Sequence, residues 1–301
     1  MKAFYSPVFE LPLPTGHRFP MAKYRLLHDR VATHSQAWGV ELLSAPPATR
    51  EQLVRVHEEA YLDRIFDGTL SDVEIRRIGF PESAELVTRS RRSTGATIEA
   101  ALAAWKDRVA VNLAGGTHHA QRSQGQGYCL FNDVAVAIEE MRHRRLAKRF
   151  IVIDLDVHQG NGTAELYTSD SNVFTFSMHG KQNFPFSKTP SDLDIALPNG
   201  TGDLVYLETL QHALDRLPLR EADMVFYIAG ADPYQHDRLG KLSLTQTGLA
   251  VRDEMVLQTC DAYELPVAIS MAGGYAQRIE EIVDIHAETI RLAATFANNG
   301  A

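Results

Sequence analysis

Short apolar runs alternate with longer segments of helical periodicity along most of the chain. Seven runs have the length and the apolar, β-branched or aromatic content of strands: 2–5, 39–43, 109–113, 151–155, 173–177, 224–229 and 267–271. The main segments with helical spacing or capping residues lie between them: 22–36, 49–66, 83–106, 132–148, 203–216, 246–262 and 278–298. Strands that alternate with helices predict a single-domain, three-layer α/β/α fold with a mostly parallel central sheet over residues 1–301.

Two segments fall outside this alternation. Residues 6–20 are rich in proline and glycine, and a loop of that length in a compact domain is usually functional or poorly ordered. Residues 179–202 contain three prolines, so they are predicted to be irregular.

The strand at 151–155 runs directly into a dense group of polar side chains. Asp154, Asp156 and His158 alternate along an extended chain, so they are expected to project from one face. Burying two carboxylates and an imidazole together costs free energy unless a cation neutralises them, and an Asp-x-His pair suits a zinc-like ion. An aspartate that only caps the next helix explains this pair equally well at this point.

Three further strands end in unusual polar loops: His118-His119, Asp232 and Gly273-Gly274-Tyr275. Ligand-binding sites of open α/β sheets lie outside the carboxyl ends of the strands. The three loops and the loop after 151–155 are therefore expected side by side at that edge of the sheet, which we call the rim. There Asp156, His158 and Asp232 would form a three-ligand metal site with an open position for water.

Each of these groups also has an ordinary structural explanation. Tandem imidazoles can act as general base and general acid, or be one structural and one exposed histidine. The O–H of Tyr275 can stabilise a developing oxyanion, or belong to a common loop aromatic. Asp232 precedes a proline and can be a turn residue. The shared rim is what favours the chemical interpretation.

Composition narrows the class of protein. The 301 residues are 45% hydrophobic and carry a net charge of −8, which argues against direct nucleic-acid binding. The two cysteines, Cys129 and Cys260, are too few for a disulfide framework or a thiolate-rich zinc site. No apolar run approaches the ~20 residues of a membrane span, and the N-terminus lacks a signal peptide, so a cytoplasmic enzyme is expected.

Five motifs resemble the zinc-dependent histone deacetylase family, which has the arginase/deacetylase fold. They occur in family order between residues 115 and 275: Gly-Gly-Thr-His-His, Gly-Tyr-Cys-Leu-Phe-Asn-Asp, Asp-Leu-Asp-Val-His-Gln-Gly-Asn-Gly, Ala-Gly-Ala-Asp and Ala-Gly-Gly-Tyr. A weaker likeness, His57-Glu-Glu-Ala-Tyr61, lies nearer the N-terminus. The resemblance implies a metal-dependent deacylase that removes acetyl or longer fatty acyl groups from the ε-amine of lysine.

The resemblance also implies two ion sites. Asp156, His158 and Asp232 resemble the family's zinc ligands, and iron can replace zinc in such sites. The family binds a potassium ion beneath the zinc through a residue like Asp154 and backbone oxygens near His158. Ser177 resembles the hydroxyl ligand of that second ion.

The implied catalytic residues come from three of the motifs. His119 resembles the general base that activates water and then protonates the leaving amine. His118 resembles its electrostatic partner, oriented by Asp154. Tyr275 stands where the family polarises the scissile carbonyl. Asn161 occupies a position that is aspartate in class I members, which implies a neutral partner for His119.

The implied substrate contacts are fewer. Tyr128 resembles one aromatic wall of the acyl-lysine tunnel, and Phe184 is the candidate for the other. Gly127 and Gly273, in the matching motifs, are assigned to substrate binding as well.

The segments 236–243 and 270–278, together with Asn161, look most like class IV of the family. That class includes members that prefer long fatty acyl groups, so the resemblance leaves the acyl length open. The resemblance also leaves open whether the acylated amine is a protein lysine or a small molecule, and what the oligomeric state is.

Three alternatives compete with this interpretation. An arginase-like enzyme with two manganese ions needs carboxylates where Gly160 and Tyr234 stand, which disfavours it. An acetylpolyamine or other small-molecule deacylase suits the acidic net charge, but such enzymes usually carry a long insertion at the entrance, and this chain has none. A binding module without catalysis tends to lose the tyrosine or a ligand, and every such position is intact here.

Overall fold

The computed structural model describes residues 1–299, and its centre is one eight-stranded sheet in which every neighbouring pair of strands is parallel. Its strands are β1 (Lys2–Tyr5), β2 (Glu41–Ser44), β3 (Val109–Asn112), β4 (Phe150–Asp154), β5 (Val173–Gly180), β6 (Leu193–Leu197), β7 (Met224–Ile228) and β8 (Val267–Ser270). They lie side by side in the order β2-β1-β3-β8-β7-β4-β5-β6. The predicted parallel sheet is confirmed.

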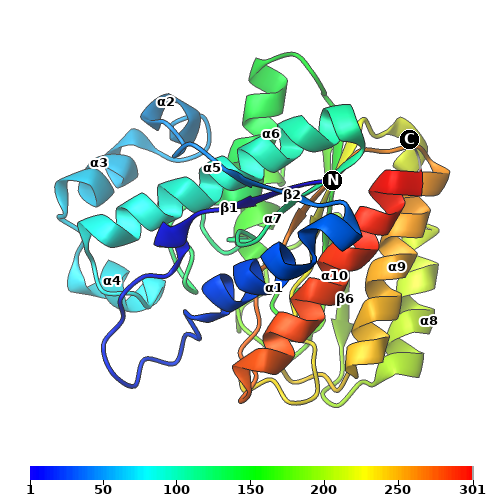
Figure 1. Ribbon diagram of the computed structural model, residues 1–301. Coiled ribbons are helices and arrows are strands. Elements are labelled where there is room, and N and C mark those ends of the chain that lie inside the picture. Colours follow the sequence, from blue (N-terminus) through cyan, green and yellow to red (C-terminus); the bar gives the residue numbers. More distant parts are fainter. Residues whose placement is uncertain (300–301) are drawn as a thin grey trace.

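Helices cover both faces of this sheet (Figure 1). The α-helices are α1 (Lys23–Trp38), α2 (Arg50–Leu53), α3 (Glu59–Asp67), α4 (Asp72–Ile78), α5 (Ala84–Asp107), α6 (Asp133–His143), α7 (Asn161–Tyr167), α8 (Asp203–Leu214), α9 (Gln246–Ala262) and α10 (Ile279–Asn299). Helices α1, α8, α9 and α10 pack on one face, and α5 and α6 pack on the other. The predicted three-layer architecture is therefore confirmed.

The burial of β4 shows why the segment that leads to the polar cluster becomes a central strand. Ile151 and Ile153 pack into the core on the side of α8 to α10, whereas Phe150 and Val152 pack into the core on the side of α5 and α6. All five residues of the strand are buried. A strand that is apolar on both faces is stable where helices cover both faces.

The segment predicted as one helix, 49–66, is divided in two. Thr49 opens α2 with a capping box, but α2 ends at Leu53 and α3 begins only at Glu59. Between them the ring of His57 is buried and bonded to a distant loop: its Nδ1 lies 2.9 Å from Gln121 O, and its Nε2 accepts from the backbone N–H of Asn132 at 3.1 Å. These two long-range hydrogen bonds outweigh the local helical periodicity.

Because one ring nitrogen donates and the other accepts, His57 is held neutral. Burial lowers the pKa of His57 to about 4, below the ~6.5 of an unfolded histidine. The folded state therefore binds fewer protons, and stability is lost as the pH falls from 6.5 to 4, by about 3 kcal/mol from this group. When the free energy of unfolding is measured by chemical denaturation across this pH range, it is expected to fall less steeply with decreasing pH in His57→Gln than in the wild type. An equal fall in both proteins would contradict a buried, neutral His57.

Other departures lie outside the strongly periodic segments. Helix α6 ends at His143 rather than at 148, because Arg145 takes a left-handed φ of 58°. Helix α4 is additional, and β6 forms inside the segment predicted as irregular. β6 is a short edge strand that pairs with β5, and its three middle residues are exposed or half-buried.

The four strands that end in polar loops, β3, β8, β7 and β4, are neighbours in the sheet. Since they are parallel, their carboxyl ends meet at one edge and the loops that follow them lie side by side. The order of the strands thus places the four polar loops next to one another at the rim.

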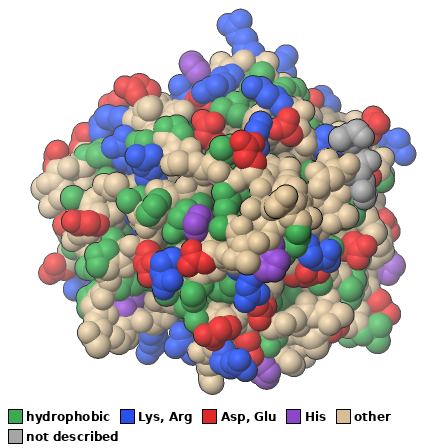
Figure 2. All heavy atoms as spheres, viewed as in Figure 1, with side chains coloured by type: hydrophobic (Ala, Val, Ile, Leu, Met, Phe, Trp, Pro, Cys, Tyr) green, Lys and Arg blue, Asp and Glu red, His purple; other side chains and the backbone are tan. Residues whose placement is uncertain are grey.

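The surface adds one general feature. Over the face drawn in Figure 2, the basic and acidic side chains of residues 1–299 are interspersed rather than gathered into one basic surface. None of the helices in this part of the chain is long and apolar enough to cross a membrane.

Candidate active site

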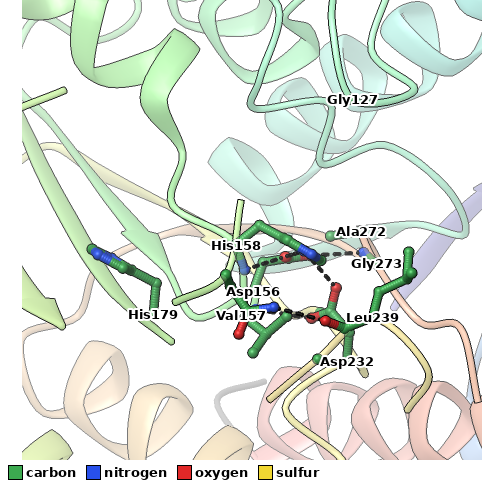
Figure 3. A network of polar contacts seen from close by, with 12 residues as sticks. Gly127, Asp156, Val157, His158, His179, Asp232, Leu239, Ala272 and Gly273 are labelled. Atoms are coloured by element: carbon green, nitrogen blue, oxygen red, sulfur yellow. Dashed lines mark hydrogen bonds and ion pairs between the residues drawn. The ribbon is translucent and has the colours of Figure 1, made fainter. Parts of the chain in front are cut away.

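The structure brings together the three predicted metal ligands, Asp156, His158 and Asp232, at the carboxyl ends of β4 and β7 (Figure 3). All three are buried, and one ligand atom from each lies within 4.8 Å of the others. His158 Nδ1 is 3.0 Å from Asp156 Oδ1 and 3.1 Å from Asp232 Oδ2. One imidazole nitrogen therefore faces two carboxylates.

Backbone amides hold both carboxylates in place. Val157 N donates to Asp232 Oδ1 at 2.8 Å, His158 N to Asp156 Oδ1 at 2.9 Å, and Gly273 N to Asp156 Oδ2 at 2.9 Å. A Cβ at Gly273 would lie 2.0 Å from Asp232 Oδ2, so only glycine allows this loop to approach so closely. The imidazole faces Asp232 Oδ2, which accepts no amide hydrogen bond, and Asp156 Oδ1, which also accepts from His158 N.

The charges of the cluster fit a bound cation. Although burial opposes it, the two carboxylates raise the pKa of His158 to about 10. Burial and the neighbouring charge of Asp156 raise the pKa of Asp232. Two buried carboxylates around one imidazole thus require a positive charge, and a divalent ion supplies it when the imidazole is neutral. Two oxygen ligands and one nitrogen ligand suit zinc or iron and leave a coordination position open.

The tandem histidines His118 and His119 lie against this cluster, with ring centroids 4.2 Å apart. His118 Nδ1 is 2.6 Å from Asp154 Oδ2, and this carboxylate raises the pKa of His118 to about 9 against the effect of burial. His119 Nδ1 is 2.8 Å from Asn161 Oδ1 instead. Burial and the positive charges nearby lower the pKa of His119 well below its usual range. The surroundings therefore shift the two pKa values in opposite directions: Asp154 favours the protonated form of His118, whereas burial and nearby positive charge favour the neutral form of His119.

The loop that carries these histidines is anchored by Asp133, which the sequence interpretation missed. Asp133 accepts hydrogen bonds from Gly116 N at 2.9 Å and Thr117 N at 2.7 Å. Thr97 Oγ1 of α5 donates to the same carboxylate at 2.5 Å. The signal that could have found it is a charged residue next to the cap Asn132, followed by five apolar residues of the same helix.

Tyr275 and its loop are held by contacts from two distant parts of the chain. Its N–H donates to Asp237 Oδ2 at 2.6 Å and its carbonyl accepts from Arg238 Nε at 2.9 Å. The buried Lys23 Nζ donates to Ala272 O at 3.0 Å and lies 5.5 Å from the Tyr275 ring centroid. Burial raises the pKa of Tyr275 well above its usual value, so the phenol is an O–H donor at neutral pH. No local sequence pattern indicated Lys23 or Asp237.

A cleft of about 410 Å³ reaches these groups from the surface. Its walls include both predicted tunnel aromatics, Tyr128 and Phe184, together with Leu239 and Tyr275, and it is also lined by His119 and His158. The Phe184 ring stands perpendicular to that of His119 at a centroid distance of 4.9 Å. The cleft thus joins the aromatic walls to the histidine and tyrosine of the rim.

Gly127 and Tyr128 form a sharp turn in the cleft wall. Both residues have positive φ values, 57° and 67°, and a Cβ at Gly127 would lie 2.6 Å from His119 Cδ2. Glycine is required here by conformation and by space, and the turn aims the Tyr128 ring at the cleft.

The residues predicted to bind potassium are neighbours as well. Ser177 pairs with Asp154 in the β4–β5 register, and both are buried. Ser177 Oγ lies 3.0 Å from Nδ1 of His179. The potassium site stays a prediction.

A parallel α/β/α sheet whose rim holds a buried Asp/His/Asp cluster, two histidines and a tyrosine has the arginase/deacetylase-like fold with a candidate metal site. Residues 17–290 match the histone deacetylase domain model, so the chain belongs to the histone deacetylase family. Its activity is accordingly that of a deacetylase, a hydrolase of amides.

Several similar proteins support this family. The chain is 44% identical to an uncharacterised protein of Picosynechococcus sp., over 96% of this chain and 97% of that protein. It is 29% identical to histone deacetylase 2 of Arabidopsis thaliana, over 78% of this chain and 64% of that protein. It is 28% identical to a histone deacetylase-like amidohydrolase of Pseudomonas aeruginosa, over 88% and 74% respectively. The crystal structure of the HD domain of HDA15 has the same fold, with a TM-score of 0.81, 21% identity, and coverage of 98% of this chain and 88% of that chain.

Proposed function

We propose that this chain hydrolyses the amide of an ε-N-acyl-lysine, with Asp156, His158 and Asp232 as the ligands of a zinc ion. The observation that carries the proposal is that one cleft is lined by a cluster residue, His158, by the neutral histidine His119 and by the phenol of Tyr275. An amide carbonyl that enters this cleft meets a metal site, a base and an O–H donor at once.

In this proposal His119 is the base and then the acid. Its Nδ1 faces the Asn161 carbonyl oxygen and carries the hydrogen, so the lone pair of the neutral ring is on Nε2. That nitrogen takes a proton from the attacking water and delivers it to the amine that leaves. A zinc ion held by Asp156, His158 and Asp232 would lower the pKa of the water and polarise the carbonyl.

The remaining residues stabilise charge and position the substrate. The Tyr275 O–H donates to the oxygen that becomes negative when the carbonyl is attacked. Burial and the neighbouring His118, which is bonded to Asp154, keep the pKa of His119 low. Tyr128 and Phe184 enclose the apolar stem of the lysine. The class IV likeness leads us to include long fatty acyl groups among the substrates.

The test is turnover by the zinc- or iron-loaded protein of lysine peptides that carry acyl groups from acetyl to myristoyl. We expect release of the free carboxylic acid and the free lysine from at least one peptide, and its loss when a chelator removes the metal. Monoacetylated spermidine is assayed in parallel. Turnover of the polyamine with no turnover of any peptide would replace the proposal by a small-molecule deacylase.

A further inference from the structure

The entrance of the cleft carries charge of one sign. Among the residues that line it, Arg76 and Arg77 are the only lysine, arginine, aspartate or glutamate side chains. Both lie in the last turn of α4 and are exposed, and α4 lies at the lower left of Figure 1. On a chain with a net charge of −8, a substrate that approaches the cleft therefore meets two positive charges and no carboxylate on its walls.

Neither guanidinium is neutralised within residues 1–299. The structure gives Arg76 no ion pair there, and Arg77 donates to Gln124 Oε1, which is an uncharged amide. The nearby carboxylate of the same helix, Glu74, forms an ion pair with Arg64 at 2.8 Å and accepts hydrogen bonds from Ser71. Arginines in the last turn of a helix interact favourably with its dipole. This interaction does not neutralise them, so their charge can still act on a ligand in the cleft.

The backbone of this helix end is fixed to the cleft wall. Arg77 O accepts from Gly127 N at 3.0 Å, and Ile78 O accepts from Tyr128 N at 2.7 Å. The two arginines are thereby joined to the turn that presents Tyr128. Main-chain hydrogen bonds therefore fix the backbone of this helix end relative to the cleft wall, while the two side chains are exposed.

The segment around Leu239, in another part of the cleft wall, does not direct a carboxylate into the cleft. Asp237, the carboxylate closest in sequence to Leu239 of the cleft, accepts from Leu239 N and Gly240 N at 2.8 Å each and from Tyr275 N at 2.6 Å. It is therefore directed into the protein. Its neighbour Arg238 adds a further exposed cation beside Tyr275.

We propose that Arg76 and Arg77 are specificity-determining residues that select acyl-lysines flanked by glutamate or aspartate in a peptide. This rests on the proposed lysine deacylase function and deepens it. Carboxylates beside the acyl-lysine meet the two guanidiniums at the entrance, whereas lysines beside it, or the second and third amines of a polyamine, meet like charge. Exposed pairs of this kind are weak individually, so two of them give a preference of roughly three- to tenfold.

The test compares three peptides that differ only in the two residues beside one acetyl-lysine: glutamate, glutamine or lysine on both sides. We expect kcat/KM of the wild type to fall in that order, and the difference to shrink in 1 M salt, where the Debye length is about 3 Å. Arg76→Glu with Arg77→Glu is expected to invert the order, and Arg76→Gln with Arg77→Gln to remove it. Monoacetylated spermidine is expected to be a poor substrate of the wild type that improves in the glutamate variant.

The control variant is Arg216→Glu, an exposed arginine after the end of α8 that does not line the cleft. It is expected to leave the order of the three peptides unchanged. Hydrolysis of all three at equal kcat/KM, or inversion by Arg216→Glu, would overturn the proposal and leave the lysine deacylase function standing. Failure of all three peptides, together with the whole acyl panel, would instead overturn the proposed function itself.

Discussion

Replacing Asp156 by alanine is expected to abolish tight metal binding and to lower kcat/KM on the order of 10³-fold. The reason is that a metal contributes several kcal/mol to the stabilisation of the transition state, and each 1.36 kcal/mol is a factor of ten in rate. Asp156 supplies one of the three converging ligand atoms, and its other oxygen accepts from Gly273 N. Its loss therefore removes a ligand and loosens the loop that leads to Tyr275.

A thermal melt with and without zinc separates these effects from simple misfolding. Ligand that binds only the folded state stabilises it by about 2.7 kcal/mol at 100 times the Kd, so the wild type is expected to melt at a higher temperature with zinc. Asp156→Ala is expected to melt at the same temperature in both conditions. Asp215→Asn, an exposed carboxylate after α8, is the control. Wild-type turnover and metal content in Asp156→Ala would refute the ligand assignment.

Replacing His119 by alanine is expected to lower kcat about 10²- to 10⁴-fold while the zinc content stays at the wild-type level. His119 lines the cleft, and its Nδ1 is held by Asn161 rather than by a ligand of the cluster. Turnover and metal analysis of the same sample measure the two effects. Undiminished turnover would remove His119 from the reaction, and loss of zinc would mean that its role is structural.

The variant Asn161→Asp gives an independent measurement of the same group. An anionic partner at Nδ1 raises the pKa of His119, because it favours the protonated ring. The base must be neutral to take a proton, so the acidic limb of the pH profile of kcat/KM is expected to move to higher pH. An acidic limb at the wild-type position would show that His119 is not the group that titrates.

The candidate site was predictable to the extent that it depends on the ends of strands. Asp154 ends a strand that is apolar on both faces, and Asp156 and His158 follow it. The position and the end of such a strand can be predicted from its apolar run. The pairing of these residues with Asp232, 74 residues beyond His158, followed from the rule that parallel strands end at one rim. Motif order and resemblance then supplied the chemical roles.

Contacts between remote segments were not predictable in this way. Lys23 supports the loop of Tyr275 from 249 residues before Ala272, and nothing in the local sequence of α1 marks that lysine. His57 interrupts a segment with helical periodicity because its partners, Gln121 and Asn132, lie in another loop. A local pattern cannot report a hydrogen bond whose second group is far away in the chain.

The sequence by itself determined the layered parallel fold, the rim and the residue types of the metal cluster, because apolar periodicity and strand ends are local properties of the chain. The tertiary structure alone decided what surrounds them. It placed the short helix α4 against the Gly127–Tyr128 turn through main-chain hydrogen bonds, which brings Arg76 and Arg77 to the entrance of the cleft. The residue types of the candidate site thus follow from the local sequence, and the charges at the entrance of the cleft depend on how distant segments pack.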